Sequence, residues 1–151
     1  MMKPQVLEEY LLKNIPLSSA MGVKVDSISL EKVILKAPFS NNINHKQTVF
    51  GGSLHAVLTL ACWSFLHVRL NEVYGNIAQI VIASSEIQYL APVAFDFKAE
   101  CSMTNILEWE KFIKIFEKKG KARIKLESKI YQEDQLLVDY SGIFVAIKIN
   151  T

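Results

Sequence analysis

The stretch QTVFGGSLHAVLTLACWSFLHV, residues 47–68, decides the fold because it contains no Asp, Glu, Lys or Arg. An uncharged run of this length is long enough for a transmembrane helix. It also carries two glycines, two serines and two histidines, which are costly in lipid. We therefore expect a helix that starts at Gly51-Gly52, runs to about Leu70 and lies buried inside a soluble protein, with a membrane helix as the alternative.

The overall composition limits the possible classes of function. The chain has 151 residues, a length that suits one domain over residues 1–151. Its net charge of +2 is too small to create the field that nucleic-acid binding requires. Half of the residues are apolar and 21% are charged, which excludes a disordered chain. The chain is therefore expected to fold around a substantial apolar core and to bind no nucleic acid.

The N-terminus and the cysteines indicate a cytoplasmic protein. Glu8 and Glu9 stand where a secretory signal would carry its apolar stretch. Cys62 and Cys101 both lie in apolar surroundings, as buried thiols do in a reducing compartment. The sequence contains no CxxC motif or Cys/His cluster, so we expect neither a metal nor a cofactor.

Short elements are expected before the apolar helix. Residues 4–13 begin with Pro4 and place apolar side chains on one side, which predicts a short helix. From Gly22 the apolar residues alternate, and this pattern predicts a hairpin that ends near Ala37. The alternation changes parity at Asp26-Ser27, where we expect a β-bulge.

The sequence after the apolar helix predicts four strands and a second helix. That helix begins at a capping box formed by Asn105 and Glu108 and ends at Gly120. The nearly continuous apolar run at 77–90 predicts a strand covered on both faces. In the last strand the apolar alternation shifts parity at Gly142, from Val138 and Tyr140 to Ile143, Val145 and Ile147. The four strands are expected at residues 77–90, 93–103, 122–130 and 135–147.

The resulting order is helix, β, β, long apolar helix, β, β, short helix, β, β. One long apolar helix and about six antiparallel strands form an α+β arrangement. The sheet must then curve around the helix to cover its apolar surface.

This order resembles the hot-dog fold of acyl-CoA thioesterases and dehydratases. The residues that carry the resemblance are Asn44, Thr48 to Leu54 at the start of the helix, and Trp63. They look like the thioesterase domain at the C-terminus of YiiD-type proteins and, more distantly, like the phenylacetate-pathway thioesterases, which have an Asn, a short loop and His-Gly-Gly. The resemblance covers residues 5–148. It implies hydrolysis of an acyl-CoA or acyl-carrier-protein thioester.

Two departures from those relatives affect the predicted chemistry. Phe50 replaces the His of His-Gly-Gly, and Thr59 occupies the helix position of the acidic base, nine residues later. The base therefore cannot be carried over from the relatives. A non-catalytic acyl-binding or regulatory module stays open as a second function, and a dehydratase as a third.

The candidate catalytic residues lie around the start of the helix. The first N–H groups of a helix lack internal partners and sit at the positive end of its dipole, so Gly51 and Gly52 are expected to bind the oxyanion. The alternative is a Gly-Gly turn that is needed only for the chain to enter the helix beneath the sheet. Asn44 is expected to orient water or to hold the thioester carbonyl. The alternative is a loop residue whose side chain bonds the backbone of its own loop. Ser53 is expected to contact substrate or water, or to cap the helix. Thr59 is expected to position water, or to bond the preceding turn.

The candidate substrate-binding residues come from the same region and from a later strand. His45 and His55 carry imidazoles, the side chain most often used as a base in catalysis, so either is also a candidate base. Phe50 is expected to contact the substrate. Hot-dog subunits pair sheet edges, so a homodimer or a dimer of dimers is expected, in which Ser84, Ser85 and Glu86 of a second subunit face the Gly-Gly end. Glu86 is a further candidate base, or else an exposed charge. The basic cluster that could meet substrate phosphates, or simply be solvated, consists of Lys118, Lys119, Lys121, Arg123 and Lys125.

Overall fold

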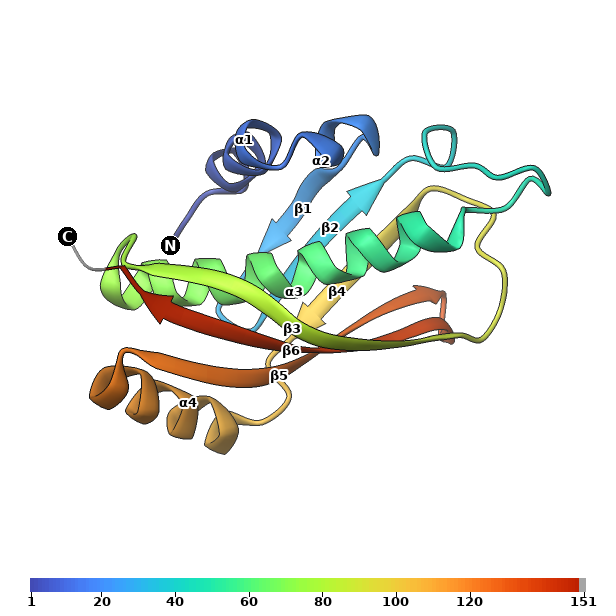
Figure 1. Ribbon diagram of the computed structural model, residues 1–151. Helices are drawn as coiled ribbons and strands as arrows, with labels where there is room; N and C mark the ends of the chain where they lie inside the picture. Colours follow the sequence, from blue (N-terminus) through green and yellow to red (C-terminus); the bar gives the residue numbers. More distant parts are fainter. Residues whose placement is uncertain (150–151) are drawn as a thin grey trace.

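The computed structural model describes residues 1–149, which form one six-stranded antiparallel sheet and four helices (Figure 1). The strand order is β1-β2-β4-β5-β6-β3. The elements, in chain order, are α1 (Pro4–Asn14), α2 (Pro16–Ala20), β1 (Lys24–Ile28), β2 (Lys32–Ala37), α3 (Gly51–Tyr74), β3 (Ala78–Tyr89), β4 (Phe97–Ser102), α4 (Ile106–Lys119), β5 (Lys121–Gln132) and β6 (Gln135–Lys148).

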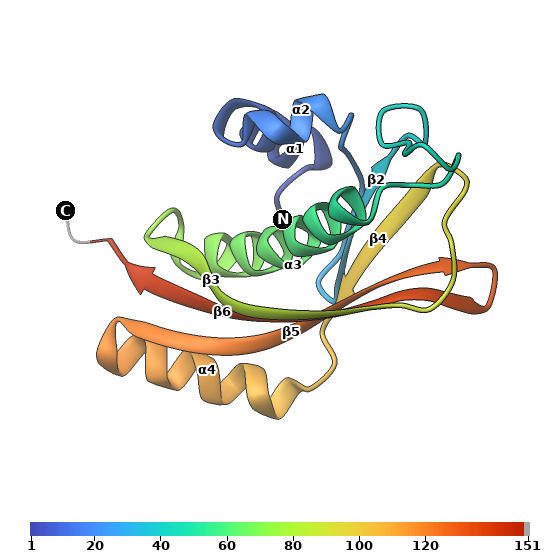
Figure 2. The same cartoon turned by 45° about the vertical axis from the view of Figure 1, so that its right-hand side comes forward.

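The long apolar helix α3 lies inside the curve of the sheet, as the sequence predicts (Figures 1 and 2). It is four residues longer than expected and ends at Gly75, whose φ of 73° stops the helix. By length and composition α3 could cross a membrane, but 67% of its most apolar window is buried inside the protein. Its apolar side chains therefore form the core of an α+β domain with the hot-dog arrangement.

Helix α4 fills an opening in the sheet. Strands β4 and β5 pair only at Glu100–Lys129 and Cys101–Ser128, so they diverge beyond this point. Aromatic side chains of α4 pack against α3 in the gap, with the Trp109 ring 6.4 Å from that of Phe65. The Asn105 half of the predicted capping box is present, since its side chain accepts the N–H groups of Leu107 and Glu108. The return bond from the Glu108 side chain is absent among the described residues. As predicted, Gly120 ends the helix, in the left-handed conformation.

Strand β3 corrects one sequence prediction. It was expected to be covered on both faces, but it is an edge strand and most of its residues are exposed. Val81 and Ile82 remain 49% and 43% exposed. A continuous apolar run is typical of a strand that is buried on both faces. Within residues 1–149 of a single chain, however, no other element covers β3 at this edge of the sheet.

Strand β6 corrects a second prediction, because its apolar parity does not change at Gly142. Val138, Tyr140 and Gly142 face the core, and the same parity continues through Phe144 and Ala146. Ile143 and Val145 lie on the outer face, in hollows that they share with Ile115 of α4. Both faces of this half-strand carry apolar residues, so the sequence pattern could not tell which one faced α3.

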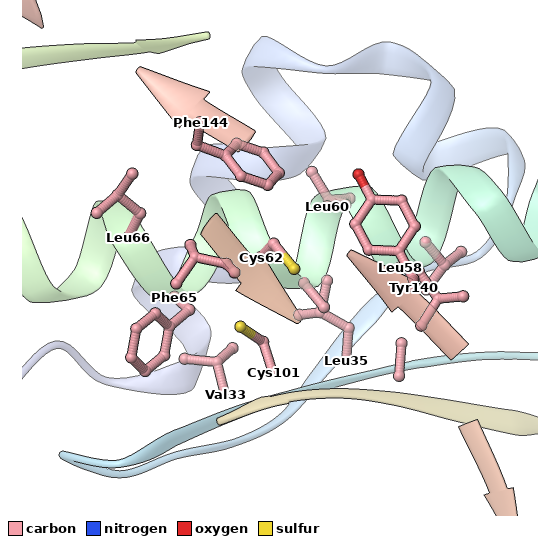
Figure 3. Close-up of a cluster of buried hydrophobic side chains, with 14 of the residues drawn as sticks. Val33, Leu35, Leu58, Leu60, Cys62, Phe65, Leu66, Cys101, Tyr140 and Phe144 are labelled. Carbon is pink, nitrogen blue, oxygen red and sulfur yellow. The ribbon is translucent and has the colours of Figure 1, made fainter. Parts of the chain in front are cut away.

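The core contains two free thiols in contact. Cys62 of α3 and Cys101 of β4 are fully buried, and their sulfur atoms point toward one another (Figure 3). The hydrogen bond with Cys62, together with burial, raises the pKa of Cys101 well above its usual value. Cys101 is therefore held in the neutral thiol form.

Candidate active site

The N-terminus of α3 presents two free backbone donors. Phe50 is the N-cap residue, and its carbonyl accepts the N–H groups of Ser53 and Leu54 at 3.0 and 3.2 Å. Within residues 1–149 the N–H groups of Gly51 and Gly52 have no hydrogen-bond partner. No side chain caps this end. Two adjacent donors at the positive end of a 24-residue helix can bind an anion or a polarised carbonyl.

Aromatic side chains flank these donors. The Tyr89 hydroxyl donates to the Gly51 carbonyl at 3.0 Å. The Phe50 ring lies over Gly52, where a Cβ would come within 2.4 Å of it. A side chain at residue 52 would therefore have to displace the Phe50 ring, and it would also hinder the close approach of a ligand to the helix end. Phe50 is 58% exposed and lies beside the two free N–H groups.

Asn44 is engaged within its own loop. Its side-chain nitrogen donates to the Thr48 hydroxyl at 2.8 Å, and its oxygen accepts the N–H groups of Lys46 and Thr48. Its backbone N–H donates to the Thr48 carbonyl. In this structure Asn44 therefore organises its own loop, which was the alternative to a role in holding water or the carbonyl.

Four polar side chains meet between α3, β3 and β6. His55 Nε2 lies 3.1 Å from the Ser85 hydroxyl. The Thr59 hydroxyl lies 2.8 Å from the Tyr140 hydroxyl and 2.9 Å from the His55 carbonyl. The His55 and Tyr140 rings meet edge to face, with centroids 5.4 Å apart. The structure thus brings together three predicted residues from two elements, α3 and β3. Ser85 comes from the same chain, whereas the sequence analysis expected it from a second subunit.

Tyr140 is a member of this cluster that sequence reasoning missed. It is almost fully buried, and its hydroxyl points toward α3 (Figure 3). Burial raises its pKa. The available signal was a tyrosine at a core-facing position of the last strand, because a buried phenol needs a hydrogen-bond partner.

The other predicted residues lie apart from this cluster. Ser84 and Glu86 flank Ser85 in β3 and therefore point to the opposite face of the sheet, where they line a hollow with Lys125. His45 is exposed on the loop before α3. Ser53 lies on the first turn of α3 and makes no side-chain hydrogen bond within the described chain.

A ring cluster lies farther along α3. His67 stacks on Trp63 and on Tyr10 of α1, with centroid distances of 4.8 and 4.7 Å. The Trp63 indole donates to the Ile80 carbonyl of β3 at 3.2 Å. Burial lowers the pKa of His67. The cluster ties α1 and β3 to the helix that carries the site.

The outer face near α4 is basic. Lys121, Arg123 and Lys125 alternate along β5 and line the hollows described above, together with Lys119. None of these four forms an ion pair within residues 1–149. The same part of the chain contains no group of three or more His, Cys, Asp and Glu side chains that could hold a metal ion.

Solved structures with the same architecture include both unassigned proteins and thioesterases. A protein of unknown function from Chlorobaculum tepidum is 32% identical, with a TM-score of 0.90 over 96% of this chain and 94% of its own. A "putative thioesterase" from Shewanella oneidensis is 25% identical, with a TM-score of 0.80 over 95% and 96%. A thioesterase from Haemophilus influenzae, 11% identical with a TM-score of 0.75 over 100% and 94%, shares the fold.

A family model extends this likeness to the sequence. The model described as "Putative thioesterase (yiiD_Cterm)" matches residues 4–148, which is almost the whole chain. Its match includes the helix end with the two free N–H groups and all four residues of the polar cluster. The chain therefore belongs to the YiiD C-terminal thioesterase family and has the hot-dog fold.

Proposed function

We propose that the protein hydrolyses an acyl thioester by direct attack of water at the N-terminus of α3. The observation that carries this proposal is the pair of free N–H groups at Gly51 and Gly52. Attack of water on a thioester carbonyl creates an oxyanion. Preorganised N–H donors stabilise that charge, and a single such donor contributes about 10²–10³ in rate.

The substrate is an acyl group carried by coenzyme A or by an acyl carrier protein. Both carriers present phosphate groups, and the four unpaired cations on the outer face supply a matching positive charge. The apolar side of α3 beside β3 supplies a surface for the acyl chain. A cytoplasmic location agrees with the two reduced thiols in the core.

A second subunit completes the site in this proposal. The edge of β3 is twelve residues long and has no partner strand on one side within residues 1–149. An exposed edge that carries Val81 and Ile82 favours pairing with another copy. A homodimer, or a dimer of dimers, would then bring the second copy's β3 close to Gly51 and Gly52. Light scattering at micromolar concentration tests this arrangement, and a monomer would contradict it.

A non-catalytic acyl-binding module is the second candidate. It is favoured by Thr59, which stands in the place of the relatives' carboxylate and whose hydroxyl is engaged by the His55 carbonyl and Tyr140. A dehydratase has less support, because Glu86 and His55 lie on opposite faces of the sheet and cannot act together within one chain.

The test uses two substitutions at one position. Phe50 has ψ of 131°, the extended conformation that a residue before proline prefers, and Gly51 is the first helical residue, where proline is favoured. Gly51→Pro therefore removes one N–H group and keeps the helix. Gly51→Ala keeps the N–H group, and its Cβ makes an ordinary 3.5 Å contact with Tyr89.

Thiol release is measured with a panel of aliphatic and aryl acyl-CoA substrates. We expect turnover by the natural sequence and a kcat for Gly51→Pro about 10²–10³ below that of Gly51→Ala. Equal kcat values for the two variants would contradict the role of the Gly51 N–H. No release above background with any acyl-CoA or acyl carrier protein substrate would contradict hydrolysis and leave the acyl-binding module, which binding calorimetry would detect.

A further inference from the structure

We propose that His55 is the base that takes the proton from the attacking water, and that Ser85, Tyr140 and Thr59 are positioning residues that keep its ring in one tautomer. This inference rests on the proposed thioester hydrolysis. It identifies the general base, which was left unassigned because Thr59 occupies the position of the relatives' acidic residue. The three positioning residues come from three different elements, so none of them is adjacent to another in sequence.

His55 lies on the same face of α3 as the two free donors. It follows Gly51 by four residues and Gly52 by three, and such residues are neighbours on a helix surface. Helical side chains lean toward the N-terminus, so the imidazole covers the turn that contains the glycines. Strand β3 follows this face, with Tyr89 contacting Gly51 and Ser85 contacting His55. Water beside the ring is therefore close to the carbonyl that Gly51 and Gly52 would hold.

The direction of the hydrogen bonds follows from counting protons. The Thr59 hydroxyl has one proton and two neighbours, the His55 carbonyl at 2.9 Å and the Tyr140 hydroxyl at 2.8 Å. A helical threonine donates to the carbonyl four residues earlier, which is His55. The phenol, a stronger acid than an aliphatic alcohol, then donates its own proton to the Thr59 oxygen.

Ser85 continues the chain in the same direction. Once Tyr140 has donated its proton, its oxygen can only accept, and Ser85 is the hydroxyl beside it on the same face of the sheet. Ser85 therefore donates to Tyr140 and uses its oxygen to accept from His55 Nε2, 3.1 Å away. The complete chain runs from His55 Nε2–H through Ser85, Tyr140 and Thr59 to the His55 carbonyl.

This chain assigns the two nitrogen atoms of the imidazole. Nε2 carries the proton, so Nδ1 has a free lone pair and no hydrogen-bond partner within residues 1–149. Glu86 is on the other face of β3, and no carboxylate forms an ion pair with His55 in the described chain. A neutral imidazole with one lone pair available is the form that a general base requires.

The reaction balances with these groups. Water loses a proton to His55 Nδ1 while its oxygen forms a bond to the acyl carbon, and the carbonyl electron pair moves to the oxygen held by the Gly51 and Gly52 N–H groups. The tetrahedral intermediate then collapses and the C–S bond breaks. The leaving thiolate takes the proton from the His55 imidazolium. The products are a carboxylic acid and a free thiol, and no oxidant or reductant is consumed.

Nuclear magnetic resonance of ¹⁵N-labelled histidine tests the tautomer without any substrate. We expect His55 to show a protonated Nε2 and an unprotonated Nδ1 at pH 8, with His45 and His67 as internal references. Tyr140→Phe removes the acceptor for the Ser85 proton, so Ser85 turns to donate to Nε2 and the ring shifts toward the Nδ1–H tautomer. Tyr74→Phe is the matched control, since Tyr74 bonds Glu117 on α4. A protonated Nδ1 in the natural protein would overturn the chain.

Kinetics test the base. His55→Asn should lower kcat/KM by about 10²–10⁴ and remove the acid limb of its pH profile. Tyr140→Phe should lower kcat with KM nearly unchanged, whereas Tyr74→Phe should leave both unchanged. An unaltered kcat/KM and acid limb in His55→Asn, in an enzyme that hydrolyses thioesters, would refute the base and leave the proposed function intact. An inactive natural protein would refute the proposed function, while the tautomer measurement still decides the positioning chain.

Discussion

Gly142→Ala should both destabilise the protein and displace the Tyr140 hydroxyl. Gly142 lies in β6 between Tyr140 and Phe144, whose rings close over it from both sides. A Cβ here would stand 2.7 Å from the Phe144 ring and 2.9 Å from the Tyr140 hydroxyl oxygen. Both neighbours would have to retreat by about 0.5–0.7 Å to reach the 3.4 Å at which ordinary contact begins. Neither has room, because Tyr140 and Phe144 are 1% and 0% exposed.

The expected magnitude follows from two opposing terms. Forcing extra volume into a packed core costs about 1–3 kcal/mol. Replacing glycine by alanine restricts the unfolded chain and returns about 0.4–1 kcal/mol. The net loss of about 1–2 kcal/mol corresponds to a Tm lower by roughly 2–8 °C for a domain of this length. Retreat of the Tyr140 hydroxyl also changes its 2.8 Å contact with Thr59, so kcat should fall as well.

Thermal and urea unfolding, followed by circular dichroism, measure this effect. Gly51→Ala is the matched control for stability, since its Cβ meets only ordinary contacts at 3.5 Å. In a Phe144→Leu background the cost of Gly142→Ala should shrink, because one of the two clashes is removed. A Tm of Gly142→Ala equal to or above that of the natural protein would refute the packing described for β6.

Three further results are expected. Asn105→Ala should lower the free energy of unfolding by about 1 kcal/mol, measured by urea denaturation, because α4 loses its N-cap; no change would contradict the capping role. Burial lowers the pKa of His67 from 6.5, so the unfolded chain binds its proton more readily. Stability should therefore be full above about pH 6.5 and fall as the pH drops toward the lowered value, and His67→Phe should flatten this dependence; an equal slope in both proteins would contradict it. Cys62 and Cys101 should resist a thiol reagent in the native protein at pH 8 and both react in denaturant, whereas fast native reaction would contradict their burial.

Much of the fold could be predicted from local sequence signals. The uncharged run before Arg69 specified a buried helix, Asn105 and Gly120 marked the ends of α4, and the parity change at Asp26-Ser27 located a bulge that the pairing of β1 with β2 contains. Each signal acts within a few residues. The exposure of a strand depends instead on which neighbouring element covers it. The alternation of apolar residues within the strand does not indicate which element that is.

The candidate site was predictable only in part. The Gly51-Gly52 end of α3 could be located because helix ends leave N–H groups free wherever they occur. His55 and Thr59 could be placed on one face by their spacing. Nothing in the sequence paired Ser85 with His55, or Tyr140 with Thr59, because 30 and 81 residues separate them.

By itself the sequence determined that a helix without charged residues from Gly51 to Val68 would form the centre of an α+β domain, because burying that many apolar side chains leaves few other arrangements. It also determined that the helix would begin at two glycines with free donors. Only the tertiary structure decided which polar groups meet beside those donors. Curvature of the sheet around α3 brings β3 and β6 to the same face of the helix, and this places the hydroxyls of Ser85 and Tyr140 within hydrogen-bonding reach of His55 and Thr59.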